Sequence, residues 1–334
     1  MKKNIFSLLI CLTIIIFSCK RDNSKFEGPD LNDLYGTFSV SEPFSANRDS
    51  VNFAANELVV FSASFTTMID WKISIKGLNS GAVKIITGKS KLIDAGNSLW
   101  NGSTTEFPLF KAEKCAVELT FLTEPDTLRD TIKILQPKLN QGFKIADFET
   151  GMVTGWTTFI QSGANMNFGV ATTSPVPQGN KFYNMAGTVN WDWLIGLIEF
   201  PASAYGAPRF PLNTNAQNVY FNVLVWGEPG LTNALLLFQF REDDNGNGIF
   251  ESASEDEYDY QLSINWTGWK LISVKYSDLV TLVNGAPASP KGNQLHNPDK
   301  LMKISTLHLA NPASGFSKTK MDYILFTENA ALEP

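Results

Sequence analysis

Cysteine and histidine are scarce in this chain, and their scarcity excludes several kinds of chemistry. The 334 residues contain three cysteines, Cys11, Cys19 and Cys115, and two histidines, His296 and His308. Cys11 and Cys19 lie in or beside an N-terminal apolar run, so Cys115 has no disulfide partner in the rest of the chain. We expect Cys115 to be a small buried apolar residue, because no histidine is close in sequence to activate its thiol. The histidines do not form a pair of metal ligands, and His308 is expected to be a strand residue.

An excess of positive charge is also absent. The formal net charge is −6, with 27 lysines and arginines against 33 aspartates and glutamates. Nucleic-acid binding needs a basic face that displaces counterions, so nucleic acid is excluded as a partner. The sequence also has no glycine-rich phosphate loop that follows a strand into a helix, and no Gly-x-Ser-x-Gly nucleophile elbow.

One long hydrophobic run is present, over residues 5–17, and two lysines precede it. A membrane-spanning helix needs about 20 apolar residues, so this shorter run predicts an export signal over residues 1–18. The segment Ile-Phe-Ser-Cys at 16–19 resembles the lipobox of bacterial lipoproteins. The resemblance implies cleavage before Cys19 and lipid attachment to its side chain, which ties the mature chain to a membrane. An ordinary secretory signal and a transmembrane anchor are the alternatives.

The segment after the signal predicts a flexible tether. Residues 19–33 are polar and contain a glycine followed by a proline. Lys20, Arg21 and Asp22 partly match the charged stretch that directs lipoproteins of Bacteroidetes-like bacteria to the cell surface. We therefore expect a lipid-anchored protein of the cell outer membrane, exposed at the surface. The sequence does not distinguish between the inner and the outer leaflet of that membrane.

Residues 34–137 alternate apolar and polar side chains. The runs WKISIK at 71–76 and VELTFL at 117–122 show this period of two, and turn-forming residues separate the runs. Such alternation is typical of strands with one buried and one wet face. The pattern predicts an immunoglobulin-like β-sandwich, which would serve as a spacer, with Trp71 in its core.

Residues 138–334 are also rich in strand signals. No long helical periodicity and no internal repeat is present in this part of the sequence. The segment predicts a jelly-roll β-sandwich, so the expected fold class is all-β with two sandwich domains. The clearest expected strands are 219–226, 234–241, 257–266, 268–276 and 321–327.

Three segments of this second domain resemble galactose-binding-like carbohydrate modules: ADFE at 146–149, TGWKLISV at 267–274 and MDYILF at 321–326. Together with the lipoprotein signal and the spacer, they make the whole chain similar to surface glycan-binding lipoproteins of Bacteroidetes-type polysaccharide-utilisation systems. The resemblance implies a non-catalytic protein with a glycan ligand. It also implies an outer-membrane transporter complex as a candidate partner.

Tryptophans in loops and at strand ends are the candidate sugar-binding residues, because flat aromatic rings pack against the C–H faces of pyranose rings. The run Asn-Trp-Asp-Trp at 190–193 has two such rings beside polar groups, and Trp226 runs into a Gly-Glu-Pro-Gly turn. Core packing is the alternative for each of these tryptophans. Trp269 alternates with apolar residues and is expected to be structural. The predicted ligand-binding residues are Asn190, Trp191, Asp192, Trp193, Trp226, Gln239 and Arg241, with the last two placed on a neighbouring strand.

The run DDNGNGIFE at 243–251 fits the first half of an EF-hand-type calcium loop. Calcium takes several oxygen ligands on a tight curve. The predicted metal ligands are Asp243, Asn245, Asn247, Ile249 and Glu251. The twelfth loop position is Ser254 instead of the usual glutamate, so a polar hairpin loop without metal is the alternative. The resemblance to other jelly rolls implies a second candidate calcium site, at Glu149 and Asp322.

Three carboxylates at 255, 257 and 259 share one face of an expected strand, as the catalytic acids of some glycoside hydrolases do. Their order departs from the Glu-x-Asp-x-Glu pattern of that family, and the face is expected to be wet. A jelly-roll glycoside hydrolase is therefore the alternative function. A structural or adhesive surface protein that binds another protein is the second alternative.

Overall fold

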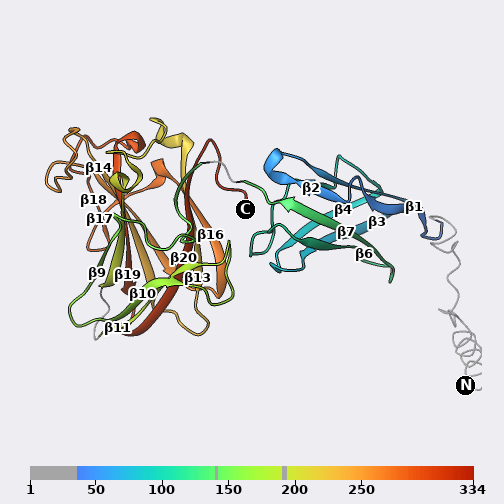
Figure 1. Cartoon of the computed structure of the whole chain (residues 1–334), viewed down its shortest axis with the longest axis horizontal. Helices are drawn as coiled ribbons and strands as arrows, with labels where there is room; N and C mark the ends of the chain where they lie inside the picture. Colours follow the sequence, from blue (N-terminus) through green and yellow to red (C-terminus); the bar gives the residue numbers. More distant parts are fainter. Residues whose placement is uncertain (1–35, 140–141, 190–193) are drawn as a thin grey trace, which may run out of the picture.

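The computed structural model describes residues 36–139, 142–189 and 194–334. These residues form β-strands and short 3-10 turns in two bodies that lie side by side along the long axis (Figure 1). The all-β expectation is confirmed. No helix among the described residues is long and apolar enough to cross a membrane. The expectations for the signal, for Cys19 and for the tether lie outside the described residues.

The first body is organised around one long strand, β3 (Val59–Gly77), which pairs with β1, β4, β5 and β6. Buried and accessible residues alternate along β3, as the sequence pattern predicted. Trp71 is 3% exposed and lies in the core, which confirms its expected place. The other strands are β1 (Val40–Ala46), β2 (Ser50–Asn52), β4 (Val83–Ile93), β5 (Leu99–Trp100), β6 (Lys114–Phe121) and β7 (Thr127–Gln136).

The second body is a sandwich of two antiparallel sheets, as expected for a jelly roll. Sheet I has the order β10-β11-β20-β13-β16, and β8 also pairs with β20. Sheet II has the order β15-β14-β19-β12-β9. The strands of sheet I are β8 (Phe143–Ala146), β10 (Asn165–Ala171), β11 (Phe182–Val189), β13 (Val219–Gly227), β16 (Gly268–Lys275) and β20 (Gly315–Glu328). Those of sheet II are β9 (Thr157–Ile160), β12 (Leu194–Pro201), β14 (Ala234–Glu242), β15 (Glu257–Ile264) and β19 (Leu301–Ala310).

Smaller elements connect these strands. A hairpin packs beside sheet II, and its strands are β17 (Thr281–Val283) and β18 (Ala286–Ala288). The 3-10 turns are η1 (Phe53–Ala55), η2 (Ala202–Tyr205), η3 (Ala216–Asn218), η4 (Tyr276–Asp278) and η5 (Pro298–Lys300).

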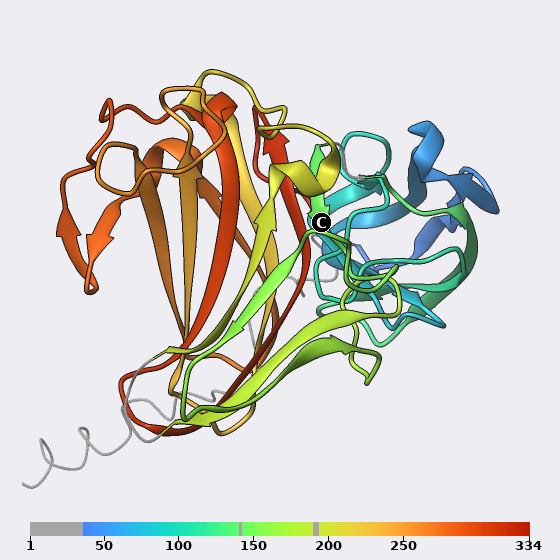
Figure 2. The same cartoon turned by 60° about the vertical axis from the view of Figure 1, so that its left-hand side comes forward.

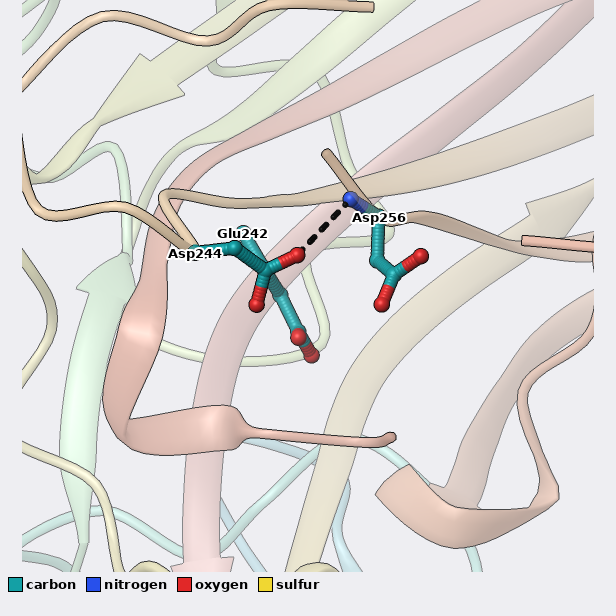
Figure 3. A group of neighbouring side chains, drawn as sticks. All are labelled: Glu242, Asp244 and Asp256. Atoms are coloured by element: carbon teal, nitrogen blue, oxygen red, sulfur yellow. Dashed lines mark hydrogen bonds between the residues drawn. The ribbon is translucent and has the colours of Figure 1, made fainter. Parts of the chain in front are cut away.

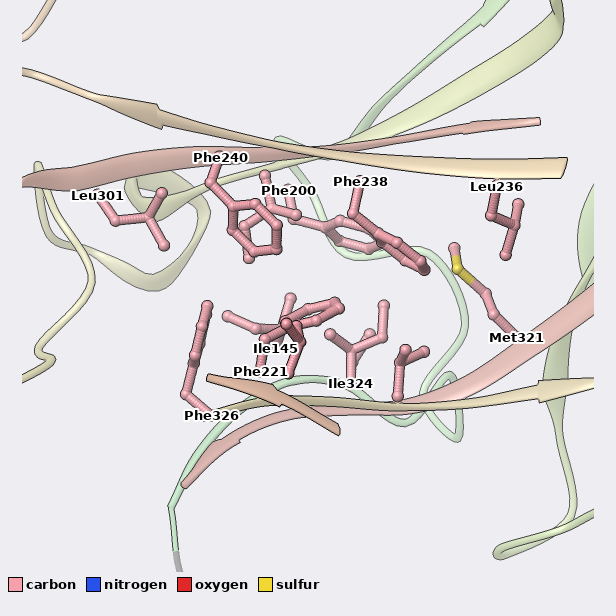
Figure 4. Close-up of a cluster of buried hydrophobic side chains, with 14 of the residues drawn as sticks. Ile145, Phe200, Phe221, Leu236, Phe238, Phe240, Leu301, Met321, Ile324 and Phe326 are labelled. Atoms are coloured by element: carbon pink, nitrogen blue, oxygen red, sulfur yellow. The ribbon is translucent and has the colours of Figure 1, made fainter. Parts of the chain in front are cut away.

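The core of the second body lies between sheets I and II and is rich in phenylalanine (Figure 4). Phe221 of β13 meets Phe238 and Phe240 of β14, with ring centroids 5.1 and 5.0 Å apart. Since side chains alternate along a strand, the neighbours of these core residues point outward. Trp226 therefore lies on the outer face of sheet I, whereas Gln239 and Arg241 lie on the outer face of sheet II.

The chain passes from the first body to the second between β7 and β8, and further contacts hold the two bodies together. The Leu109 N–H donates to the Pro177 carbonyl at 2.8 Å. The Lys138 ammonium pairs with Glu333 at 2.9 Å, so the last residues of the chain lie between the bodies (Figures 1 and 2). These contacts bring loop 105–110 of the first body to the edge of sheet I.

Candidate functional site

Two tryptophans form an aromatic pair on the outer face of sheet I. Trp226, near the end of β13, lies directly opposite Trp269 of β16 in the strand register. Their ring centroids are 5.6 Å apart and the ring planes meet at 61°. Both side chains are partly exposed. Trp269 was expected to be structural; β16 turns it away from the core, toward Trp226, and its role stays a prediction.

Charged groups surround the pair. The Trp226 indole N–H donates to Glu228 at 2.8 Å, and the Lys318 ammonium donates to the other Glu228 oxygen at 2.8 Å. Lys320 lies between two aromatic rings, with its ammonium 4.6 Å from the Trp226 centroid and 4.8 Å from the Phe182 centroid. Burial alone would raise the pKa of Glu228, but the hydrogen bonds from Lys318 and Trp226 hold it below its usual range. The carboxylate is therefore ionised at neutral pH and fixes one edge of the indole.

A pocket of about 490 Å³ opens beside the pair. The Trp269 indole N–H donates to the carbonyl of Pro175 in the β10–β11 loop at 2.9 Å, so this loop forms one wall. Residues 105–108 of the first body also line the pocket. The first body thus forms part of the pocket wall.

A second hollow of about 590 Å³ lies on the same outer face, over β10, β11 and β20. Asn165, Asn167 and Asn184 offer side-chain amides there, and the Asn184 amide donates to the Asn167 carbonyl at 3.0 Å. Lys318 lines this hollow and also bonds Glu228, so it links the amide-rich hollow to the tryptophan pair. Aromatic and hydrogen-bonding groups therefore share one face of sheet I.

Gln239 and Arg241 do not join this site. They were placed on a strand next to Trp226, but β14 pairs with β15 and β19, whereas β13 pairs with β20 and β16. That expectation is wrong, because the chain crosses from sheet I to sheet II between β13 and β14 instead of turning back as a hairpin. On sheet II, Arg241 pairs with Glu257 at 2.5 Å and Glu199 at 3.3 Å. Both residues are engaged in a hydrogen-bonded network of their own sheet.

The acidic residues of β15 are held in hydrogen bonds within sheet II and to the β17–β18 hairpin. The Gln239 amide donates to both Glu257 and Asp259, at 3.0 and 3.3 Å. Burial raises the pKa of Asp259 to about 6. However, this carboxylate is 1% exposed and accepts the Leu282 N–H at 2.7 Å, beneath the β17–β18 hairpin. A substrate cannot reach it without displacement of that hairpin.

The predicted calcium loop bonds largely to itself. Asp243 accepts backbone N–H groups of residues 246–248 and pairs with Arg209 at 3.2 Å. Glu251 accepts the side-chain amides of Asn245 and Asn247, at 2.9 and 2.6 Å. The Ile249 side chain is exposed. The five residues do lie together on one turn, and their role as calcium ligands stays a prediction.

A different set of carboxylates lies at the start of this loop, and it shares no residue with the predicted metal ligands. One oxygen from each of Glu242, Asp244 and Asp256 falls within 4.8 Å of the others (Figure 3). Burial raises the pKa of Glu242 to about 8, against hydrogen bonds from the Tyr276 hydroxyl and the Asn297 N–H. The sequence did not predict that these three residues form one group. Their only signal is the acidic run at 242–244 followed by a second acidic run at 255–257.

The residues implied as a second calcium site also lie close together. Asp322 is fully buried, and its Oδ2 has no hydrogen-bond partner among the described residues. Burial raises its pKa, and the charges of Glu149 and Asp147 add to the shift. Gln178 likewise has a buried side-chain oxygen without a described partner. Carboxylate and side-chain amide oxygens are ligands that calcium prefers, and calcium binding at this place stays a prediction.

Four predicted ligand residues, Asn190, Trp191, Asp192 and Trp193, lie outside the described residues. Of the seven, the described structure places Trp226 on an accessible face and Gln239 and Arg241 on the opposite sheet. It adds Trp269, Glu228 and Lys320 around Trp226. The strand register Trp226–Trp269 could not be read from the sequence, because it depends on which strands pair.

Comparisons with known proteins give a class of similar structures but no family. No known family matches the chain, and no curated protein matches it. Among solved structures, it is similar to carbohydrate-binding modules.

One such module is the family 11 module from Clostridium thermocellum in complex with a β-1,3-1,4-mixed-linked tetrasaccharide. It has 16% identity and a TM-score of 0.38, and covers 59% of this chain and 99% of that chain. Another is the CBM22-1 xylan-binding domain of Paenibacillus barcinonensis Xyn10C, with 15% identity, a TM-score of 0.32, and 58% and 99% coverage.

A longer similarity is to SGBP-B from a complex xyloglucan utilization locus in Bacteroides uniformis. It has 11% identity and a TM-score of 0.35, and covers 87% of this chain and 73% of that chain. These similarities are too distant to assign a function. The second body is described as a sandwich because of the pairing of its own strands into two sheets.

Proposed function

We propose that this protein binds a polysaccharide or oligosaccharide on the outer face of sheet I. The observation that carries the proposal is the partly exposed Trp226–Trp269 pair, with centroids 5.6 Å apart beside a pocket of about 490 Å³. A pyranose ring presents C–H groups that pack on an aromatic plate and hydroxyls that need polar partners. Glu228 and Lys318 supply fixed polar groups at the edge of the plate.

The ligand is a chain of several sugars rather than a single one. The amide-rich hollow over β10, β11 and β20 continues the face beyond the tryptophan pair, and Lys318 borders both. Side-chain amides suit sugar hydroxyls, because each offers two donors and an acceptor. A glycan that stacks on the tryptophans would reach these amides with its next residues.

Binding without hydrolysis is the activity we propose. The paired carboxylates of β15 face the other side of the sandwich, and Asp259 is covered. A panel of soluble polysaccharides in affinity gels, with an assay for reducing ends in parallel, tests the proposal. Retardation of the protein without release of reducing ends supports it. Release of reducing ends would favour the glycoside hydrolase, and failure to bind any glycan would favour the adhesive protein.

We also propose that Cys19 carries a lipid that anchors the protein in the outer membrane, where an outer-membrane transporter complex is a candidate partner. The support is the lipobox-like segment at 16–19 and the polar tether that follows. Replacement Cys19→Ala should move the protein from the membrane fraction to the soluble fraction of the cell envelope. Protease treatment of intact cells then separates surface exposure, in which the protein is cleaved, from the inner leaflet, in which it is protected.

A further inference from the structure

Three carboxylates from two segments of the chain, the end of β14 and the start of β15, meet at one end of the second body (Figure 3). Glu242 ends β14, Asp244 follows two residues later, and Asp256 directly precedes β15. One oxygen from each lies within 4.8 Å of the others. We propose that Glu242, Asp244 and Asp256 bind a calcium ion, at a site that uses none of the predicted ligands of the 243–251 loop and lies apart from the glycan face.

Two buried polar atoms without partners point to a missing ligand. Glu242 is fully buried, and its Oε2 has no hydrogen-bond partner among the described residues. The hydroxyl of Tyr258 is in the same situation, in a residue that is 1% exposed. An unsatisfied buried polar group costs about 1–3 kcal/mol. An ion bound to Glu242, with a water molecule that accepts the tyrosine hydroxyl, satisfies both atoms.

The Tyr258 hydroxyl lies at the carboxylates and is held there. Its ring stacks on His296, with centroids 4.0 Å apart and planes at 18°. Burial raises the pKa of this phenol, and the charges of all three carboxylates raise it further. The tyrosine is therefore a second buried polar group that lies within electrostatic reach of the cluster.

The charge of the cluster matches a divalent cation. Lys300 pairs with Asp244 at 3.2 Å and is the one cation bonded to the three carboxylates among the described residues. Metal binding requires Glu242 to lose the proton that its raised pKa favours, and the three ionised carboxylates with one ammonium then leave two negative charges. The remaining contacts are N–H and O–H donors, such as those of Gly292 and Gln294 to Asp256, which orient the carboxylates without neutralising them.

The ligand set favours calcium over magnesium, because magnesium usually keeps several waters and is rarely held by protein carboxylates alone. Calcium binds oxygens at about 2.3–2.6 Å, so two ligands on opposite sides of the ion lie up to about 5 Å apart. Magnesium binds at about 2.0–2.1 Å, so its opposite ligands lie at most about 4.2 Å apart. The three oxygens lie within 4.8 Å of one another, an upper bound that both ions satisfy, so the ligand set decides for calcium.

The ion would hold a surface segment against the sandwich. The backbone N–H groups of Gly292 and Gln294 bond Asp256, and that of Asn297 bonds Glu242. Lys291, at the start of this segment, is exposed. Loss of the ion leaves the carboxylates to repel each other and loosens the segment, so trypsin should cut after Lys291 faster in chelator than in calcium.

The test compares calcium binding by the purified wild-type protein with that of Glu242→Gln and Asp256→Asn, after chelator treatment. Isothermal titration calorimetry counts the ions, and thermal unfolding with and without calcium confirms that each variant folds. Glu242→Gln keeps a carbonyl to accept from Tyr276 and Asn297. Each variant should lose one bound calcium per chain, or bind it at least about tenfold more weakly, and should lose the protection of Lys291. The exposed Asp126→Asn variant is the matched control and should behave as wild type.

Asn247→Ala separates this site from the loop, because Asn247 is a predicted loop ligand outside the cluster. This variant should keep the calcium ion that Glu242→Gln loses. Equal calcium stoichiometry and affinity in the wild type and Glu242→Gln would overturn the proposal. Absence of calcium binding by the wild type would also overturn it and would indicate a neutral Glu242 that donates a proton within the cluster.

Discussion

Trp226 and Trp269 lie opposite each other on paired strands of sheet I, with ring centroids 5.6 Å apart on the face turned away from the core. A carboxylate, Glu228, fixes the Trp226 indole, and Lys320 packs between that ring and Phe182. Both rings have little conformational freedom, because a hydrogen bond from each indole N–H holds the ring in place. Rigid aromatic side chains lose little conformational entropy when a ligand binds, so more of the contact energy of a weakly bound sugar appears as affinity.

Glu228 should act as a positioning residue for this plate. Glu228→Gln keeps an acceptor for the indole N–H but removes the ion pair with Lys318. We expect glycan affinity to fall by about 0.5–1.5 kcal/mol, the usual value of one hydrogen bond. Calorimetry gives the affinity, and tryptophan fluorescence reports whether the indole moves. Glu118→Gln, at an exposed ion pair of the first body, is the control and should change neither. Unchanged binding by Glu228→Gln would show that the carboxylate plays no part in the site.

The first body should contribute to glycan binding through residues 105–108. Phe107 lines the pocket beside the tryptophan pair, so Phe107→Ala removes part of one wall. We expect affinity to fall by about threefold to tenfold, with a smaller effect than loss of either tryptophan. Leu122→Ala is a control on the same body, at a side chain that is 80% exposed. If both variants bind as wild type does, the first body is a spacer only.

His308 should make the protein less stable in mild acid. This residue is fully buried on β19, where its Nε2 lies 2.9 Å from the Ser317 hydroxyl, and burial lowers its pKa to about 3. The unfolded chain takes up a proton near pH 6.5, whereas the folded chain does not until about pH 3. The free energy of unfolding should therefore fall as pH decreases below about 6.5, by roughly 1.4 kcal/mol per unit from this residue.

Denaturant unfolding of the wild type and His308→Asn between pH 7 and pH 5 measures this effect. The difference between the two proteins isolates the histidine, because other titrating groups are shared. A stability difference that does not change across this range would contradict the prediction.

The sequence predicted the positions of strands well, but it did not predict which strands pair. The strands expected at 219–226 and 234–241 match β13 and β14 almost to the residue, because each is a short, nearly continuous apolar run that can be read locally. Placement of Gln239 and Arg241 near Trp226 was wrong, because consecutive strands of a sandwich can belong to opposite sheets. Strand pairing depends on contacts between distant segments, and a short loop does not reveal whether the chain turns back or crosses over.

The same limit explains the residues that were missed. Trp269 follows a glycine in an apolar run, and the sequence of this strand does not show which face of the strand is buried. Glu242 and Asp256 are separated by a loop, and their proximity follows only from the β14–β15 pairing. The local EF-hand-like pattern favoured Asp243, whose carboxylate accepts backbone N–H groups of its own turn.

The most direct measurement of the central claim is polysaccharide binding by Trp226→Ala and Trp269→Ala. Affinity gels and calorimetry with a glycan that the wild type retains give the loss of affinity, and thermal unfolding gives the stability of each variant. Phe159→Ala is the matched control, at an exposed aromatic residue of sheet II. We predict that each tryptophan variant binds at least about tenfold more weakly, a loss of about 1.4 kcal/mol or more, while Phe159→Ala binds as wild type. Folded tryptophan variants that retain full affinity would contradict a glycan site on the outer face of sheet I.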